Sequence, residues 1–269
     1  MAEANPTVQR EIVRFEDGSA TDDSDTLVVE EPLEIRVRGR GIAVTMRTPG
    51  HDFELAAGFL CSEGVIHKRD DVLAINHCLQ GDAEQHGNIV NVYLSPKVDL
   101  DLERLTRHVF ASSSCGLCGK ATIDAVQQCL QPLVKTPTFR TATLKSLPTR
   151  LAEQQALFAE TGGLHAAALF NANGDLIAIR EDVGRHNAVD KLIGHGFLEG
   201  LLPFSESILL VSGRASFEIM QKALAAGIPL IAAVSAPSHL AVDFAKRSGQ
   251  TLVGFLRDDR MNVYAGQVD

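Results

Sequence analysis

Cys115 and Cys118 lie two residues apart in SSSCGLCGK, residues 112–120. The stretch has neither helical nor strand periodicity and precedes an amphipathic pattern, so we expect a loop that leads into a helix. A thiol at the beginning of a helix faces the positive end of the helix dipole, and Lys120 adds a nearby positive charge. Both effects favour the thiolate, the nucleophilic form of cysteine. The pair therefore has the properties of a reactive thiol site.

Three kinds of chemistry fit this pair. A structural zinc site needs two more Cys or His ligands, usually from a second close pair, and the sequence has only scattered candidates in Cys78, His108 and Cys129. Thioredoxin-like dithiol exchange uses a CxxC at the beginning of a helix, although the early βαβ pattern is missing here. A carrier cysteine that accepts sulfur as a persulfide uses the same activated thiolate. The spacing does not separate dithiol exchange from sulfur carriage.

A zinc deaminase is a further alternative, because Cys61-Ser62-Glu63 followed by a CxxC is similar to the deaminase signature. No proline precedes Cys115, and Cys61 falls near the end of an amphipathic pattern. We therefore interpret Cys61 as an ordinary cysteine on a helix face.

Three further stretches place polar side chains where a predicted strand meets a predicted helix or the end of the chain. Open α/β sheets bind ligands at such junctions. In REDVGRHNAVDK (180–191), Arg185 and His186 follow a glycine. VSGRASFE (211–218) begins a helix with residues suited to holding a phosphate on backbone N–H groups. In GFLRDDRMNVY (254–264), an aromatic ring and two arginines can hold a nucleotide base and phosphate. The candidate ligand-binding residues from these patterns are Arg185, His186, Ser212, Gly213, Arg214, Phe255, Arg257 and Arg260.

Each junction also has a purely structural interpretation. The first could be a capped helix with surface pairs such as Asn187 and Lys191, the second a strand that simply ends at glycine, and the third a terminal strand with solvated charges. Three such junctions in one region favour a large phosphorylated ligand more than any one of them does.

The apolar patterns predict an α/β protein with a leader and two domains. Residues 1–24 are polar and acidic, which predicts a mobile leader outside the fold. Residues 25–111 predict a smaller α+β domain with a hairpin around Gly39-Arg40-Gly41, a helix in HDFELAAGFLCSEG, a strand at 88–95 and a helix over 102–111. Residues 112–269 predict the CxxC loop, a helix over 121–130 and then strands alternating with helices, the strands buried and mainly parallel. We also expect a strand in FRTATL (139–144) and a helix whose first turn holds Pro148 and which ends at Gly162-Gly163.

Composition excludes several classes of protein. The chain has 269 residues, of which 45% are hydrophobic and 22% charged, as in globular proteins. Its longest apolar runs are far shorter than the roughly 20 residues of a membrane-spanning helix, and its beginning lacks a secretory pattern, so we expect a cytoplasmic protein that does not bind membranes. The net charge of -9 and the 5% aromatic content argue against nucleic-acid binding. Five cysteines, an odd number, argue against structural disulfides.

Taken together, the motifs resemble FdhD, the formate dehydrogenase accessory sulfurtransferase family. The resemblance covers nearly all of residues 30–265. Its strings are EEPLEIRVRG, AVTMRTPGHDFELAAGFLCSEGVI, SSSCGLCGK, TGGLHAAALF, EDVGRHNAVDKLIG, SGRASFEIMQKA, SAPSHLAV and GFLRDDRMNVY. Long strings in this order are far more specific than a CxxC alone.

The resemblance implies a sulfur carrier. Such a protein takes sulfur from a cysteine desulfurase and delivers it to Mo-bis(molybdopterin guanine dinucleotide), or to the tungsten form, for use by formate dehydrogenase. By position, Cys115 would carry the persulfide and Cys118 would assist, while residues 255–260 would contact the guanine nucleotide. The cofactor would be bound as substrate, and no permanently bound metal is expected.

The resemblance also implies an architecture. It suggests a three-layer C-terminal domain like cytidine deaminase without its metal, a smaller N-terminal α+β domain, and a homodimer. The phosphates of the cofactor would account for Arg185, Arg214, Arg257 and Arg260 in an acidic protein. Two alternatives stay open: a non-catalytic protein that escorts the cofactor, and a dithiol oxidoreductase.

Overall fold

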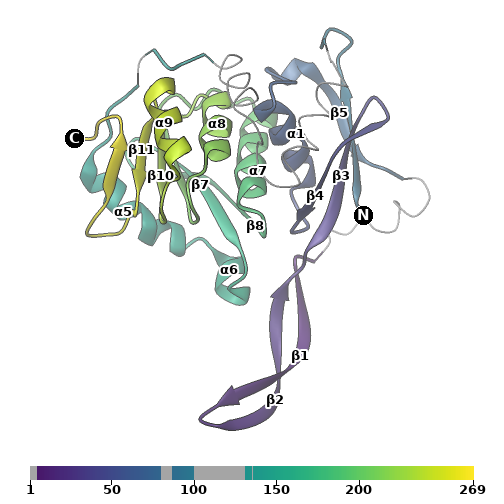
Figure 1. Cartoon of the computed structure of the whole chain (residues 1–269). Coiled ribbons are helices and arrows are strands. Elements are labelled where there is room, and N and C mark those ends of the chain that lie inside the picture. The colour runs from purple at the N-terminus through teal and green to yellow at the C-terminus, as the bar shows by residue number, and fades with distance from the viewer. Residues whose placement is uncertain (1–4, 80–86, 100–130, 135) are drawn as a thin grey trace.

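The computed structural model describes residues 5–79, 87–99, 131–134 and 136–269. These residues form a mixed α/β fold with a six-stranded sheet, a four-stranded sheet and a two-stranded hairpin (Figure 1). The expected α/β class is therefore confirmed. The CxxC with its following helix, the helix expected at 102–111, Cys129 and the 111/112 domain boundary lie outside the described residues. In the part of the chain that is described, no helix is long and apolar enough to cross a membrane.

The six-stranded sheet is mixed rather than mainly parallel, so the expected strand direction is wrong. Its order is β12-β11-β10-β9-β7-β8, and only β9–β10 and β10–β11 are parallel pairs. A tight turn containing Gly174 (φ 83°) joins β7 to β8, which forces an antiparallel pair. The strands are β7 (His165–Asn171), β8 (Leu176–Asp182), β9 (Ser207–Val211), β10 (Leu230–Ala233), β11 (Thr251–Gly254) and β12 (Asn262–Ala265).

Helices cover both faces of this sheet. One face packs against α5 (Thr141–Ala152), and the short α6 (Ala156–Thr161) follows. Gly162 ends α6 in the left-handed conformation, so the predicted helix end is confirmed, but the single helix expected before it is divided into α5 and α6. The other face packs against α7 (Arg185–Leu198), α8 (Phe217–Ala225) and α9 (His239–Ser248) (Figure 1).

The sequence 139–144 is not a strand, and Pro148 does not lie in a first helical turn. The helix α5 begins at Thr141 and continues through Pro148 to Ala152. Leu144, Leu147 and Leu151 recur at helical spacing and are almost completely buried. Burying each leucine stabilises the fold by about 1.5–3 kcal/mol, which together offsets the roughly 3 kcal/mol that an internal proline costs. The free energy gained by burying these helically spaced leucines therefore exceeds the cost of Pro148 inside the helix.

The four-stranded sheet lies on the far side of α7. Its order is β4-β3-β6-β5, built from β3 (Glu31–Val37), β4 (Arg40–Arg47), β5 (Val72–His77) and β6 (Ile89–Leu94), with the 3₁₀ turn η1 (Arg69–Asp71) before β5. The predicted β3–β4 hairpin is confirmed, with its turn at Arg38 and Gly39, which both have positive φ. One hydrophobic cluster runs from this sheet through α1 (Asp52–Ser62) and α7 to the six-stranded sheet.

Helices α1 and α7 touch through their backbones. A Cβ on Gly58 would lie 1.8 Å from the carbonyl oxygen of Asp190, and a Cβ on Gly194 would lie 1.8 Å from that of Glu54. Only glycine permits this approach. The crossing fixes α7, and with it the residues that begin α7, against the four-stranded sheet.

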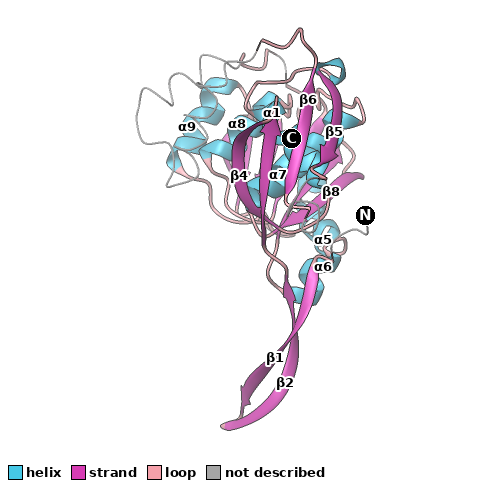
Figure 2. Ribbon diagram, turned by 90° about the vertical axis from the view of Figure 1, so that its right-hand side faces the viewer, coloured by secondary structure: helices cyan, strands magenta, loops and turns pink. Residues whose placement is uncertain are grey.

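Residues 7–28 form an extended hairpin, so the expectation that residues 1–24 lie outside the fold is wrong for its strands. The strands β1 (Thr7–Glu16) and β2 (Ser19–Val28) pair in antiparallel register along their whole length and project from the body (Figures 1 and 2). Their turn is Asp17-Gly18, and both residues have positive φ. An Asp-Gly pair is a strong local hairpin signal because both residues tolerate positive φ, and here it forms the turn despite the acidic composition of the segment.

Candidate functional site

The three candidate junctions follow strands that end at one edge of the six-stranded sheet. The backbone N–H of Ser235 donates to the oxygen of Gly213 at 3.4 Å, and that of Phe255 donates to the oxygen of Ser235 at 3.1 Å. The ends of β9, β10 and β11 are thus held side by side. Because β8 and β9 are both antiparallel to β7, β8 ends at the same edge. The three stretches, which the sequence placed after strands, therefore begin on the same side of the sheet.

Three helices begin at this edge. Ser216 caps α8 by accepting from the N–H of Ile219 at 3.4 Å, and Ser238 caps α9 by accepting from that of Ala241 at 3.2 Å. Helix α7 begins after Gly184 without a side-chain cap. The N-termini of helices attract anions, because the dipole and the first N–H groups both favour negative charge.

A pocket of about 320 Å³ lies where α7 begins. It is lined by β4, by the start of β7 and by the connection from β8 into α7. A Cβ added to Gly213 would lie 3.3 Å from Nδ1 of His165 and 3.9 Å from Cδ of Arg185, so the end of β9 also adjoins this pocket. The lining residues are Glu30, Thr45, Met46, His165, Val183, Gly184, Arg185, His186 and Asn187.

The pocket has a cationic wall. Burial is the main cause that lowers the pKa of His165, and the positive charges of Arg185, His186 and Arg214 lower it further, while Asp182 opposes them. The Nε atom of Arg185 is buried, and no described protein atom accepts a hydrogen bond from it. An anionic group in the pocket would meet both the cations and a free donor.

His186 is tied to the beginning of α8. Its Nε2 atom lies 3.1 Å from Oγ of Ser216 and 3.0 Å from a carboxylate oxygen of Glu218. The hydrogen bond with His186 is the main cause that lowers the pKa of Glu218. His186 therefore joins the first turns of α7 and α8 rather than standing free in the pocket.

A buried network fixes the connection from β8 into α7. Nζ of Lys191 lies 2.7 Å from the carboxylate of Asp182 and donates to the carbonyl oxygen of Thr48 at 2.8 Å. The side chain of Asn187 donates to Asp182 at 2.9 Å and to the carbonyl oxygen of Met46 at 2.7 Å. The interpretation of Asn187 and Lys191 as a surface pair is wrong, because both side chains join β4 to α7 from inside the protein.

The first three residues of the stretch 255–260 differ in exposure and in contacts. Phe255 is exposed and has a left-handed backbone (φ 51°), which is costly for a bulky residue and is typical of functional sites. Leu256 is completely buried in the core, so its side chain does not face a surface ligand. The guanidinium of Arg257 donates to the carbonyl oxygens of Val234 and Leu256.

The remaining residues of this stretch are exposed. Asp258 accepts from the hydroxyl of Thr149 at 3.0 Å, and the carbonyl oxygen of Arg260 accepts from the N–H of Arg257 at 2.8 Å. Asp259 and the side chain of Arg260 lie at the surface. The described lining of the pocket at α7 includes Arg185 and His186 but none of residues 255–260. The structure thus brings the first two junctions together and places the third beyond Ser235.

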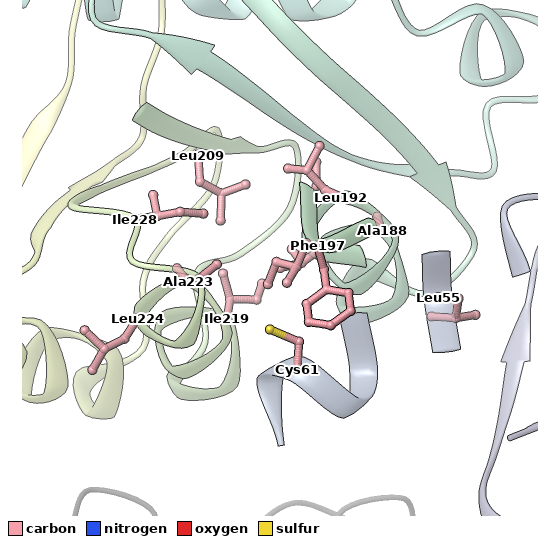
Figure 3. Close-up of a cluster of buried hydrophobic side chains, with 14 of the residues drawn as sticks. Leu55, Cys61, Ala188, Leu192, Phe197, Leu209, Ile219, Ala223, Leu224 and Ile228 are labelled. Carbon is pink, nitrogen blue, oxygen red and sulfur yellow. The ribbon is translucent and has the colours of Figure 1, made fainter. Parts of the chain in front are cut away.

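Cys61 lies on helix α1, as interpreted from the sequence, and the structure places it in the core. Its side chain points from α1 toward Phe197 and Ile219 (Figure 3). Burial, with a smaller contribution from Asp190, raises the pKa of its thiol to about 11, so it stays protonated at neutral pH. Cys78 is a free, half-buried thiol. Cys115 and Cys118 lie outside the described residues.

Sequence reasoning missed His165 and Glu218 at this edge. His165 is the first residue of β7 and directly precedes the apolar run AAALF. A titratable side chain at the start of a buried strand is the signal that could have identified it. Glu218 has no comparable signal, because its partner His186 is 32 residues away in the chain and their contact depends on the fold.

Comparisons with known proteins agree with this architecture. The model of the FdhD/NarQ family matches residues 28–268. Proteins named sulfur carrier protein FdhD are similar along almost the whole chain: that of Streptomyces avermitilis is 55% identical, covering 97% of this chain and 94% of its own, and that of Mycobacterium tuberculosis is 54% identical, covering 89% and 90%.

A solved structure shows the same fold. The crystal structure of a protein from Desulfotalea psychrophila, named as a formate dehydrogenase accessory protein, superposes with a TM-score of 0.76 at 28% identity. The match covers 97% of this chain and 98% of that one. With a family match over residues 28–268 and relatives above half identity, the chain belongs to the FdhD/NarQ family.

Proposed function

We propose that this protein is a sulfur carrier that supports the maturation of formate dehydrogenase. The observation that carries the proposal is its 55% identity, over 97% of the chain, to a protein named sulfur carrier protein FdhD. Sulfur carriage needs an accessible thiol of low pKa. Cys61 is unsuited because it is buried and its pKa is raised to about 11. The CxxC, with its position before a predicted helix, is the better candidate.

The carrier step is a thiol exchange at Cys115. Its thiolate attacks the outer sulfur of a persulfide on a cysteine desulfurase, the S–S bond to the desulfurase breaks, and the desulfurase thiolate leaves. Cys115 then carries a persulfide. In the second step, attack by the Cys118 thiolate on Sγ of Cys115 forms a disulfide and releases the outer sulfur as hydrosulfide, since the two thiols supply the two electrons. Two external thiols then reduce this disulfide: the first forms a mixed disulfide, and the second releases both Cys115 and Cys118 as thiols and leaves as the oxidised external disulfide.

The acceptor that we propose is a molybdenum or tungsten bis-pterin guanine dinucleotide, bound as substrate. Two features of the structure support an acceptor of this size and charge. The pocket at α7 offers cations and the Nε atom of Arg185, which has no hydrogen-bond acceptor among the described residues, and both suit a phosphate. The exposed ring of Phe255 and the guanidinium of Arg260 suit a base and a second phosphate at the neighbouring strand end.

The site at the sheet edge would then hold the acceptor while the CxxC supplies sulfur. We further propose that the protein works in the cytoplasm as a homodimer, with the desulfurase and formate dehydrogenase as successive partners. The family resemblance supports these partners. Light scattering of the purified protein measures its oligomeric state.

Mass spectrometry of the intact protein tests the carrier step. After incubation with a cysteine desulfurase and cysteine, the wild-type protein should gain the mass of one sulfur atom, and the Cys115→Ala variant should not. Cys78→Ala is the matched control, because Cys78 is a free and partly accessible thiol. Its variant should load normally.

The two alternatives give different outcomes. An escort protein would bind guanosine diphosphate but gain no sulfur. A dithiol oxidoreductase would reduce a disulfide substrate catalytically and would lose this activity in both the Cys115→Ala and the Cys118→Ala variants. Loading of the Cys115→Ala variant would contradict the assignment of the carrier residue.

A further inference from the structure

His165 occupies an unusual position at the candidate site. It is the first residue of β7, its imidazole lines the pocket where α7 begins, and it lies against Gly213 at the end of β9. The absence of a side chain at Gly213 leaves room for the ring, because even a Cβ there would lie only 3.3 Å from Nδ1. The ring is thus held between two strand ends and open to the pocket.

The charges that face His165 come from every element around it. Arg185 and His186 on α7, together with Arg214 after β9, are positive or can become so. Asp182 at the end of β8 is negative, but it is already bound by Lys191, Asn187 and backbone N–H groups. Glu30 lines the pocket from the other side and is exposed. Burial and this excess of positive charge keep the imidazole neutral in the empty pocket.

We propose that the pocket binds a phosphate group together with a proton, and that His165 is the residue that takes up this proton. The inference rests on the proposed function, because it assigns a proton-linked step to the site that would hold the guanine dinucleotide. A phosphate between Arg185 and His165 offsets the cations that disfavour imidazolium and supplies an acceptor for its N–H. Binding of the anion therefore favours protonation of His165.

Neighbouring groups are less suited to this role. An arginine such as Arg185 stays charged at every physiological pH, so it contributes a fixed charge and no proton uptake. The Nε2 atom of His186 is already occupied by Oγ of Ser216 and the carboxylate of Glu218, so it is not free to meet a ligand in the pocket. His165 is the described residue of the pocket whose protonation depends on what fills it.

The consequence is a ligand affinity that increases with acidity. If ligand binding raises the pKa of a group by one unit, the ligand binds roughly tenfold more tightly when the group is protonated, at low pH, than when it is neutral, at high pH. The binding and release of a phosphorylated ligand would therefore be accompanied by proton uptake and release, about half a proton per ligand for a rise of one unit. The terminal phosphate of guanosine diphosphate also titrates in this range, with the opposite effect on affinity, so only the difference between protein variants isolates His165.

Calorimetry with guanosine diphosphate from about pH 6 to about pH 8 tests the proposal. Titrations in buffers of different ionisation enthalpy count the protons taken up. Relative to the His165→Gln variant, the wild-type protein should bind more tightly at the acidic end, by up to roughly tenfold for a pKa rise of one unit, and should take up about half a proton more per ligand at a pH between the free and bound pKa values. His67→Gln, at an exposed histidine outside the pocket lining, is the matched control and should behave as wild type.

Nuclear magnetic resonance of the wild-type protein provides a readout that does not depend on a folded variant. The His165 resonance should titrate below the ordinary histidine range in the free protein and at least one unit higher with ligand bound. Equal proton uptake by wild type and His165→Gln, or an unchanged titration of His165, would overturn the proposal.

Failure of guanosine diphosphate to bind the wild-type protein would also overturn it. Sulfur loading of Cys115 would be untouched by that result, which separates this inference from the carrier function.

Discussion

The backbone contact between α1 and α7 predicts that Gly58→Ala destabilises the protein. A Cβ at Gly58 would lie 1.8 Å from the carbonyl oxygen of Asp190, whereas real Cβ atoms essentially never come within 3.0 Å of such an atom. Both sides of the contact are helix backbone, so no side chain can rotate away. The helices would have to separate by roughly 1.2 Å, the difference between these two distances.

The expected cost follows from packing. A gap of 0.5–1 Å loses about a quarter to a half of each dispersion contact across an interface, and over-packed cores lose typically about 1–3 kcal/mol. Because neither partner can yield, we expect about 3 kcal/mol or more. Alanine returns about 1 kcal/mol through its higher helix propensity. The free energy of unfolding should therefore fall by about 2 kcal/mol or more.

Urea unfolding monitored by circular dichroism measures this free energy. Gly194→Ala should behave similarly, since its Cβ would meet the carbonyl oxygen of Glu54 at 1.8 Å. The double variant should cost less than the sum of the two, because one separation of the helices relieves both contacts. Gly196→Ala is the comparison within α7: its Cβ would meet the ring of Phe204, a side chain that can shift. Unchanged or increased stability of Gly58→Ala would refute the close crossing.

Three further predictions concern charged groups. Asp190→Asn removes the carboxylate that lies 2.8 Å from Nζ of the buried Lys222. The free energy of unfolding, measured by urea unfolding, should fall by about 3–5 kcal/mol, and a loss below about 1 kcal/mol would contradict the buried pair. Burial raises the pKa of Glu54, but Arg180 and His51 together outweigh burial and lower the pKa to about 2. This carboxylate therefore contributes stability above about pH 4.5 that is lost as the pH falls toward 2. Glu54→Gln should reduce the loss of thermal stability over this acidic range, and an unaltered loss would exclude the group. Arg260→Ala should weaken guanosine diphosphate binding by roughly 10- to 150-fold in calorimetry, and an unchanged affinity would remove Arg260 from the site.

Local sequence rules predicted most of the described elements. The alternation of strand and helix patterns after residue 164 located the elements from β7 to β11, because buried strands and amphipathic helices leave different periods in the sequence. The same rules predicted helix α1 and placed Cys61 on it. They failed where two local signals competed. At Pro148 the proline suggested a helix start, and at residues 7–28 the acidic composition hid the Asp-Gly turn.

Features that depend on tertiary contacts could not be predicted. The sequence indicated that Arg185, Gly213 and Phe255 follow strand ends, but the neighbour relations among those ends depend on the strand order. The burial of Lys191 depends on Asp182 and Thr48, of which Thr48 lies 143 residues away in the chain. Long-range pairs of this kind leave no periodic trace in one sequence. These long-range pairs also fix the connection from β8 into α7, which lines the pocket.

Transfer of labelled sulfur tests the carrier function most directly. The protein is first loaded by a desulfurase with radiolabelled cysteine, freed of both, and then mixed with formate dehydrogenase whose cofactor lacks its sulfur ligand. Label should leave Cys115 and appear on the cofactor in step with the gain of formate oxidation, and the Cys115→Ala protein should support neither. Activity gained without transfer of label, or with the Cys115→Ala protein, would contradict the account.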